Sequence, residues 1–196
     1  VTSDDVLDFT LKHGIAIYVA PRTSIARSLL AAETGPAVRR ILGTRSTEIV
    51  EDCRRTLKQC DEPATSAYRT YALQAIEALE MGAYAPAQAL AANLLDGLLT
   101  ERLEANLAIA AKRRPGEAIG DVKARIHDLD VWQGYIAAAL WSTFAHYFKS
   151  KGDVVPHSFS RHATVHAAGP RQYSRRSAVQ GVMAVTAAVA YVNGMQ

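Results

Sequence analysis

The residues with the clearest chemical potential lie in one short stretch near the end of the sequence. Arg161, His162 and His166 stand close together there, within the segment from Pro156 to Arg176. An imidazole whose pKa is near neutrality can transfer protons at physiological pH, and a guanidinium stabilises the oxygens of a phosphoryl group. We therefore take these three residues as candidate catalytic residues for chemistry at a phosphate. Such chemistry requires no metal ion and no cofactor.

The charge distribution supports an anion-binding role for this stretch. The chain has 22 Lys and Arg against 19 Asp and Glu, a net charge of +3. Residues 154–196 contain no Asp or Glu, so they carry +4 and residues 1–153 carry −1. An acid-free cluster of Arg and His, with nothing nearby to neutralise it, is what an anion-binding surface requires.

Four residues after the histidines are further candidates for contact with RNA or phosphate. Arginine binds phosphate oxygens and tyrosine stacks on bases, so these side chains could follow an RNA backbone. The alternative is that they form the solvated start of the last helix. The four are Arg171, Tyr173, Arg175 and Arg176.

The spacing of the candidate residues makes a geometric prediction. Ser158 or Ser160 can cap a short helix. If Ser160 is the cap, Arg161 and His162 occupy the first turn, where backbone donors and the helix dipole favour a phosphate. His162 and His166 are four residues apart and share a helix face. Arg161 and His166 are about 140° apart on an ideal helix. They converge only if the arginine reaches around, if the first turn is irregular, or if a second subunit completes the site.

The segment from Arg161 to His166 has the pattern R-x-x-x-x-H, with the polar residue His162 directly after the arginine. It resembles the signature of the HEPN (higher eukaryote and prokaryote nucleotide-binding) domain family, whose members usually have Asn, Asp or His at that position. The resemblance covers residues 63–196 and implies a helical bundle with the motif near the start of a late helix. This chain has Ala167 after the histidine, where relatives often have glycine.

The resemblance implies a metal-independent endoribonuclease that acts as a homodimer, with the motifs of two subunits meeting in one cleft. His166 would activate the ribose 2′-hydroxyl or protonate the leaving oxygen, and Arg161 would stabilise the pentavalent phosphate. The products would carry 2′,3′-cyclic phosphate and 5′-hydroxyl ends. The implied partners are RNA, a second copy of the chain and an antitoxin or regulatory protein, as for a toxin, an antiphage protein or a phage-encoded factor.

Other interpretations of the same residues stay open. Arg161 and His166 could join the last two helices by hydrogen bonds, and His162 could be a supporting polar residue. His162 and His166 have the spacing of a metal site, but a third ligand is missing, so we expect no metal. Two further functions remain: a non-catalytic HEPN-like module that binds RNA or nucleotide, and a helical adaptor that oligomerises through its Ala and Val faces.

The hydrophobic pattern predicts an all-α protein, a helical bundle with an N-terminal helical extension. We place the boundary at Asp61–Pro63, so that residues 1–62 form the extension and residues 63–196 form the HEPN-like bundle. The extension is expected to contain helices at 3–14 and 23–33, a strand or extended segment at 15–20, and one long helix at 36–60.

Two long antiparallel helices open the predicted bundle. They are joined by a turn at 81–86, and the second is expected to end near residues 113–116. The basic run Lys112–Arg114 is interpreted as the positive end of that helix. The elements expected after it are a helix at 130–149, the motif helix, and a last apolar helix at 174–192.

Two features of the sequence indicate in which cellular compartment the protein is expected. Cys53 and Cys60 lie two helical turns apart, about 10 Å, which is too far for a disulfide, so we expect free thiols in the reducing cytoplasm. Residues 177–196 have no charge but include Gln180, Thr186 and Asn193. We therefore expect a buried core helix there and no contact with a membrane.

Overall fold

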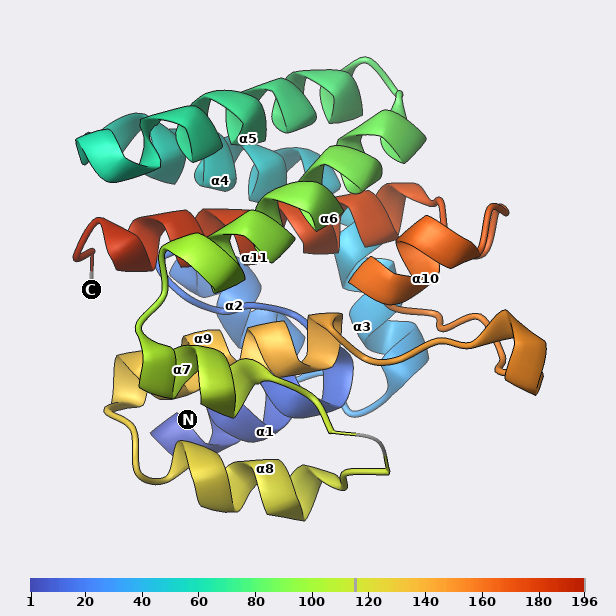
Figure 1. Cartoon of the computed structure of the whole chain (residues 1–196). Coiled ribbons are helices and arrows are strands. Elements are labelled where there is room, and N and C mark those ends of the chain that lie inside the picture. Colours follow the sequence, from blue (N-terminus) through green and yellow to red (C-terminus); the bar gives the residue numbers. More distant parts are fainter. Residues whose placement is uncertain (115, 196) are drawn as a thin grey trace.

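The protein is described by a computed structural model that places residues 1–114 and 116–195 (Figure 1). Within these residues there are eleven α-helices, two 3-10 turns and no strand, so the all-α prediction is confirmed. Two predicted features fall partly outside the described residues: the helix end around Pro115, and the end of the bundle at Gln196.

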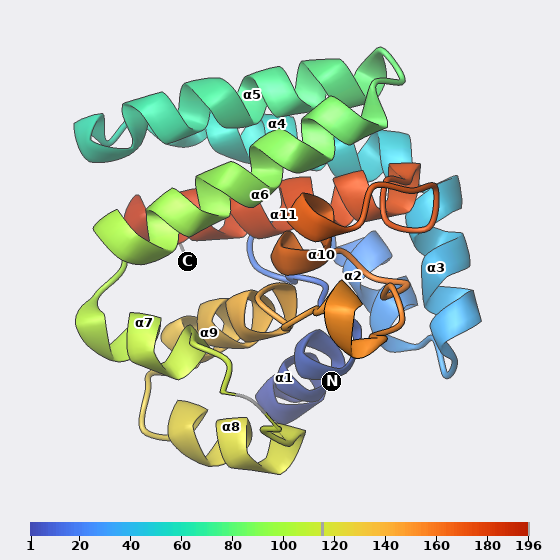
Figure 2. The same cartoon turned by 45° about the vertical axis from the view of Figure 1, so that its right-hand side comes forward.

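Helix α11 (Arg175–Val192) runs through the middle of the molecule (Figures 1 and 2). Every residue from Ser177 to Ala190 is buried, which confirms the predicted core helix. Small residues let its neighbours approach closely: a Cβ on Gly181 would lie 3.1 Å from the Cβ of Ala91 and 3.2 Å from the ring of Phe159. No helix among the described residues is long and apolar enough to cross a membrane.

One side of α11 is covered by α4 (Ser46–Gln59), α5 (Ser66–Glu80) and α6 (Tyr84–Glu101), with the 3-10 turn η1 (Pro63–Thr65) leading into α5 (Figure 1). Helices α5 and α6 form the predicted antiparallel hairpin. The prediction that the second helix continues to residues 113–116 is wrong, because α6 ends at Glu101 and a separate helix α7 (Ala105–Ala111) follows. Helix α7 packs against α9 instead of continuing along α5, so the chain has to change direction between them.

The other side of α11 contains α1 (Ser3–His13), α7, α8 (Ile119–Ile126) and α9 (Val131–Thr143). Helix α8 was not predicted. Helix α9 begins close to the predicted start at residue 130, where Asp130 is the N-cap and its carboxylate accepts from the amides of Trp132 and Gln133 at 2.9 Å. It ends at Thr143, six residues before the predicted end, and the chain after Phe144 leaves the helix to pack beside residues 160–162.

The N-terminal part departs from prediction in one helix. Residues 15–20 are an extended packing segment with a single bridge between Tyr18 and Ala20, and α2 (Thr23–Leu30) follows as expected. The single helix predicted at 36–60 is wrong: the chain forms α3 (Gly35–Thr44) and α4, separated at Arg45. The hydroxyl of Ser46 donates to the carbonyl of Gly43 at 3.0 Å, a bond that competes with helical pairing and favours a break.

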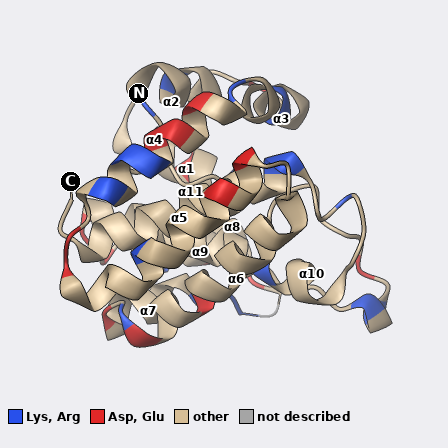
Figure 3. Ribbon diagram, turned by 90° about the horizontal axis from the view of Figure 1, so that it is seen from above, with Lys and Arg blue, Asp and Glu red and all other residues tan. Residues whose placement is uncertain are grey.

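Charges of both signs are mixed on α4, as Figure 3 shows from above. The buried carboxylate of Asp52 binds the side chain and the amide of Arg22, at 2.7 to 3.0 Å.

Residues on both sides of the predicted boundary at residue 62 contribute to one hydrophobic cluster that extends from Phe9 to Ala190. The division into an extension and a bundle therefore stays a prediction.

Candidate functional site

The motif forms a short helix, α10 (Arg161–His166), which begins after Ser160, one of the two caps that the sequence allowed. The Oγ of Ser160 accepts from the amide of Ala163 at 3.1 Å, as expected of an N-cap. With six residues the helix has only a small dipole, so side chains must supply most of the charge for any anion bound beside it.

Buried hydrogen bonds fix α10 to the rest of the molecule. The hydroxyl of Thr164 donates to the carbonyl of Ser160 at 2.7 Å and accepts from the amides of Gln88 and Gln172 at 2.9 and 3.1 Å. Tyr173 donates to the carbonyl of Thr164. One face of α10 is thereby held against α6, while Arg161 and His162 are half-buried and His166 is exposed.

A cleft lies beside the exposed part of α10, and we refer to it as the α10 cleft. Its cavity measures about 540 Å³ and is lined by residues of α6, of α7 and its C-terminal end, of the segment after α9, and of α10 itself. Apolar side chains form part of the wall, among them Leu99, Ile109 and Phe144. The basic side chains in the lining are Lys112, Arg113, His146, Arg161 and His162.

One acidic residue in the α10 cleft corrects a sequence-based expectation. The carboxylate of Asp96 lies 2.9 Å from the guanidinium of Arg161, so the arginine is not free of acidic neighbours. The sequence around the motif contains no acidic residue, but helix α6, from an earlier part of the chain, places the Asp96 carboxylate beside it. Asp96 is the only acidic residue among the described residues that line the cleft.

The side chain of His162 is held in one orientation. Its Nδ1 accepts from the amide of Tyr147 at 2.9 Å, and its ring centroid lies 4.8 Å from that of His166 and 5.9 Å from that of His146. Burial lowers the pKa of His162, and the neighbouring positive charge of His166, His146 and Arg161 lowers it further. A neutral imidazole that accepts at Nδ1 carries its proton on Nε2. His162 can therefore donate a hydrogen bond to an anion, and it is poorly placed to act as a base.

Arg161 and His166 do not meet within one chain. Arg161 lines the α10 cleft, whereas His166 is exposed on the next turn and is not among the lining residues. His162 lies between them, because its ring contacts His166 and also lines the cleft.

Besides Asp96, three basic residues of the α10 cleft were missed by sequence reasoning: Lys112, Arg113 and His146. Arg113 stacks over Trp141, with its guanidinium carbon 4.0 Å from the ring centroid, and its carbonyl lies 3.3 Å from Nε2 of His146. The basic run at residues 112–114 was visible in the sequence, but it was interpreted as the end of a helix. Lys112 does cap α7, and it lines the cleft as well.

Arg113 is supported by a buried group of hydrogen bonds. Trp141, on whose ring it stacks, donates from Nε1 to the carboxylate of Glu117 at 2.7 Å. Glu117 also pairs with Arg125 and accepts from the amide of Arg114 at 3.1 Å, and its side chain is 4% exposed. This group fixes the chain after α7 and thereby one wall of the α10 cleft.

No protein-family model matches this chain, and neither a curated protein nor a solved structure is similar to it. Its function is therefore inferred from the site itself.

The four predicted RNA-contacting residues lie outside the α10 cleft. Arg171 is exposed, and Tyr173 is half-buried with its hydroxyl bound to Thr164. Arg175 reaches the hydroxyl of Thr47 at 3.4 Å, and Arg176 lies beside Gly43, so both face the junction of α3 and α4. Their role in RNA contact stays a prediction, and any such contact would be on a different surface.

The described residues offer few side chains for metal binding or for thiol chemistry. Within residues 1–114 and 116–195 no cluster of three His, Cys, Asp or Glu side chains could hold a metal ion. Cys53 and Cys60 are free thiols, as predicted, and both are buried. Burial raises the pKa of Cys53 to about 12 and that of Cys60 to about 11, so neither is available as a thiolate at neutral pH.

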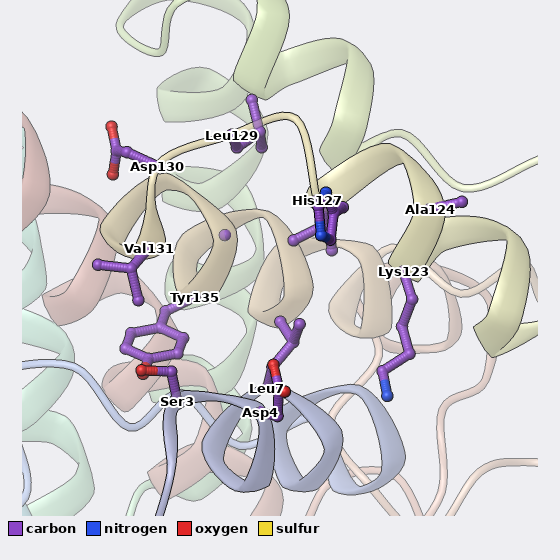
Figure 4. A pocket seen from close by; sticks show the side chains of 12 residues that line it. Ser3, Asp4, Leu7, Lys123, Ala124, His127, Leu129, Asp130, Val131 and Tyr135 are labelled. Carbon is purple, nitrogen blue, oxygen red and sulfur yellow. The ribbon is translucent and has the colours of Figure 1, made fainter.

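A second large cavity, of about 610 Å³, lies between α1, α8 and α9 (Figure 4). Leu7, Val131 and Tyr135 give it an apolar wall. Its charged residues are of both signs, and none of the predicted site residues lines it. The α10 cleft is therefore the better candidate for an anionic ligand.

Proposed function

We propose that this protein binds RNA in the α10 cleft and cleaves it as a metal-independent endoribonuclease of the HEPN type. The observation that supports this most is the composition of the cleft: Lys112, Arg113 and Arg161 around one cavity with a single carboxylate. Cations that converge on one concave surface attract a phosphodiester, and the apolar wall can accept a base.

The side chains of the cleft suggest different roles. Arg161 and Lys112 would bind the non-bridging phosphate oxygens, and the Nε2–H of His162 would donate a further hydrogen bond. His162 is thus a phosphate-binding residue in this proposal. His166, exposed and adjacent to it, would transfer the proton between the ribose 2′-hydroxyl and the leaving oxygen.

A second copy of the chain would complete the site. His166 lies outside the cleft of its own chain, and its neighbour Val165 is 61% exposed on the same short helix. An exposed apolar side chain beside a candidate catalytic residue is suited to an interface between two α10 helices. In such a homodimer, His166 of one subunit would act on a phosphate held by the other.

The test is RNA cleavage in EDTA by the purified protein, compared with His166→Ala and with the control variant His127→Ala. His127 is exposed and lines the other large cavity. We expect cleavage by the wild type and by His127→Ala, with cyclic phosphate ends, and none by His166→Ala. Equal cleavage by all three proteins would contradict the assignment of His166.

One observation favours a second candidate function, an RNA-binding module without catalysis. The Arg161–Asp96 ion pair occupies the arginine that would stabilise the transition state. A binding module requires only the net positive charge of the cleft, which the ion pair reduces but does not remove. This function would be favoured if the protein bound RNAs of several lengths saturably and cleaved none of them. The same result is needed for the protein in its dimeric form.

A further inference from the structure

A second basic pocket lies away from the α10 cleft. It has a volume of about 140 Å³ and is formed by the end of α1, the start of α3, residues 157–158 and Gln180 of α11. Figures 1 and 2 show the segment that leads to α10 passing beside α3. We call it the α1–α3 pocket.

Basic side chains surround the α1–α3 pocket. Lys12, His13, Arg39 and His157 line it, and no Asp or Glu is among the described lining residues. Within residues 1–114 and 116–195, neither Lys12 nor Arg39 forms an ion pair, in contrast to Arg161 in the α10 cleft. Burial lowers the pKa of His13, and the charges of Lys12 and Arg39 lower it further. The pocket thus has positive charge that no protein group compensates.

The start of helix α3 adds positive potential at the same place. Helix α3 has ten residues and begins at Gly35, which lines the pocket, so the positive end of its dipole lies there. A Cβ on Gly35 would lie 3.1 Å from a terminal guanidinium nitrogen of Arg39. The guanidinium is therefore folded back over the start of its own helix, where it adds to the positive end of the dipole.

A buried amide adds a further donor. Gln180 is 4% exposed and lines the pocket. Its Oε1 accepts from the amide of Phe159 at 2.8 Å, and its Nε2 donates one hydrogen to the carbonyl of His13 at 3.3 Å. Both polar atoms of this amide therefore have a protein partner, and the remaining N–H of Nε2, which has no acceptor among the described residues, can still donate to a bound anion.

We infer that the α1–α3 pocket binds a phosphate group, as inorganic phosphate or as the end of a small phosphate monoester. A volume of about 140 Å³ accepts a tetrahedral oxyanion and is well below the size of pockets for larger organic ligands, roughly 300 Å³ and more. Four basic side chains, a helix start and a free amide hydrogen match the several acceptor oxygens of such a group. This inference does not rest on the proposed ribonuclease activity.

The experiment is a titration with inorganic phosphate at constant ionic strength, followed by calorimetry and by NMR of the six histidine side chains. We expect saturable binding that shifts the resonances of His13 and His157. Arg39→Gln should weaken binding by about tenfold or more, the effect of losing one charged hydrogen bond. Arg40→Gln is the matched control, because Arg40 is exposed on the same helix and does not line the pocket.

Ribose 5-phosphate provides the second arm of the titration. If both ligands shift His13 and His157, the pocket accepts phosphate monoesters; if only inorganic phosphate does, the ligand is the free ion. Either result supports the inference. Three results would overturn it: no saturable binding of either ligand, equal binding by Arg39→Gln and wild type, or shifts confined to His146 and His162 of the α10 cleft.

Discussion

Arg161 and Asp96 together determine how strongly the α10 cleft attracts an anion. Their ion pair, at 2.9 Å, means that an incoming phosphate has to compete with a carboxylate for the guanidinium. Asp96→Asn removes the competing charge while preserving shape, and we expect it to tighten RNA binding. Arg161→Gln should weaken binding by about tenfold, because it removes a charge-assisted hydrogen bond. Fluorescence anisotropy with a short single-stranded RNA measures both effects, and weaker binding by Asp96→Asn would contradict this role.

The carboxylate of Glu117 is the centre of the hydrogen bonds that support one wall of the cleft. Burial alone would raise its pKa, but hydrogen bonds from Arg125, Trp141 and the Arg114 amide lower it from 4.5 to about 2. Because the pKa is lower in the folded state, the stabilisation is complete above pH 4.5 and is lost as the pH falls towards 2.

We expect Glu117→Gln to reduce the free energy of unfolding at pH 7 by about 3 kcal/mol, since it leaves Arg125 buried without its partner. The difference from wild type should shrink between pH 4.5 and 2, where the wild-type carboxylate becomes protonated. Urea denaturation at several pH values measures this, with the exposed Asp128→Asn as control. A difference that is independent of pH would contradict the assignment of the stabilisation to the Glu117 charge.

At the scale of elements, α10 is too short to be stable by itself and depends on the hydrogen bonds of Thr164. Thr164→Val keeps the volume but leaves the Nε2 of Gln88 without its partner and removes one of two bonds from Gln172. We expect a loss of about 2 kcal/mol in unfolding free energy, the usual cost of an unsatisfied buried group. RNA affinity should fall as well, because Arg161 and His162 lose their fixed position.

Thr70→Val is the matched control for Thr164→Val. Thr70 is exposed, and its hydroxyl donates to the carbonyl four residues earlier, as that of Thr164 does. Chemical denaturation of both variants separates loss of the buried network from loss of a local hydroxyl bond. Equal destabilisation by the two substitutions would show that the contacts with Gln88 and Gln172 contribute nothing.

Elements whose limits depend on local sequence were predicted well. Ser160 as N-cap, Asp130 as the start of α9, and the uncharged core helix α11 all follow from side chains and periodicity within a few residues. The breaks between α3 and α4 and between α6 and α7 were missed. The Ser46 hydroxyl bond at the first break was not foreseen, and the second break lets α7 pack against α9, a contact between distant segments that no local pattern indicates.

At the scale of the whole molecule, the sequence located one side of the candidate site and missed the other. Arg161, His162 and His166 are close in sequence, so their proximity was visible. Asp96, Lys112 and His146 reach the α10 cleft from three different elements, and no local pattern indicates that these elements meet. The sequence also showed that the stretch after residue 153 is positively charged. It did not show that Asp96 of α6 partly neutralises this charge.

Salt dependence tests whether the α10 cleft, and not the general surface, binds RNA. The logarithm of affinity for a single strand changes with the logarithm of salt concentration by about −0.7 per phosphate neutralised, so three cleft cations give a slope of about −2. We expect Lys112→Gln to make the slope shallower and Arg27→Gln, an exposed arginine away from the cleft, to leave it unchanged. Equal changes in the two variants would indicate diffuse surface binding.

The most direct test of the account is to map where RNA contacts the protein. A short RNA that contains 4-thiouridine would be crosslinked to the wild type and to Arg161→Gln, and the modified peptides identified by mass spectrometry. We predict crosslinks concentrated in residues 96–113 and 144–166 of the wild type, and far fewer in the variant. Crosslinks elsewhere, such as on α3 and α4 or spread over the surface, with the same yield in both proteins, would contradict the assignment of the α10 cleft as the RNA-binding site.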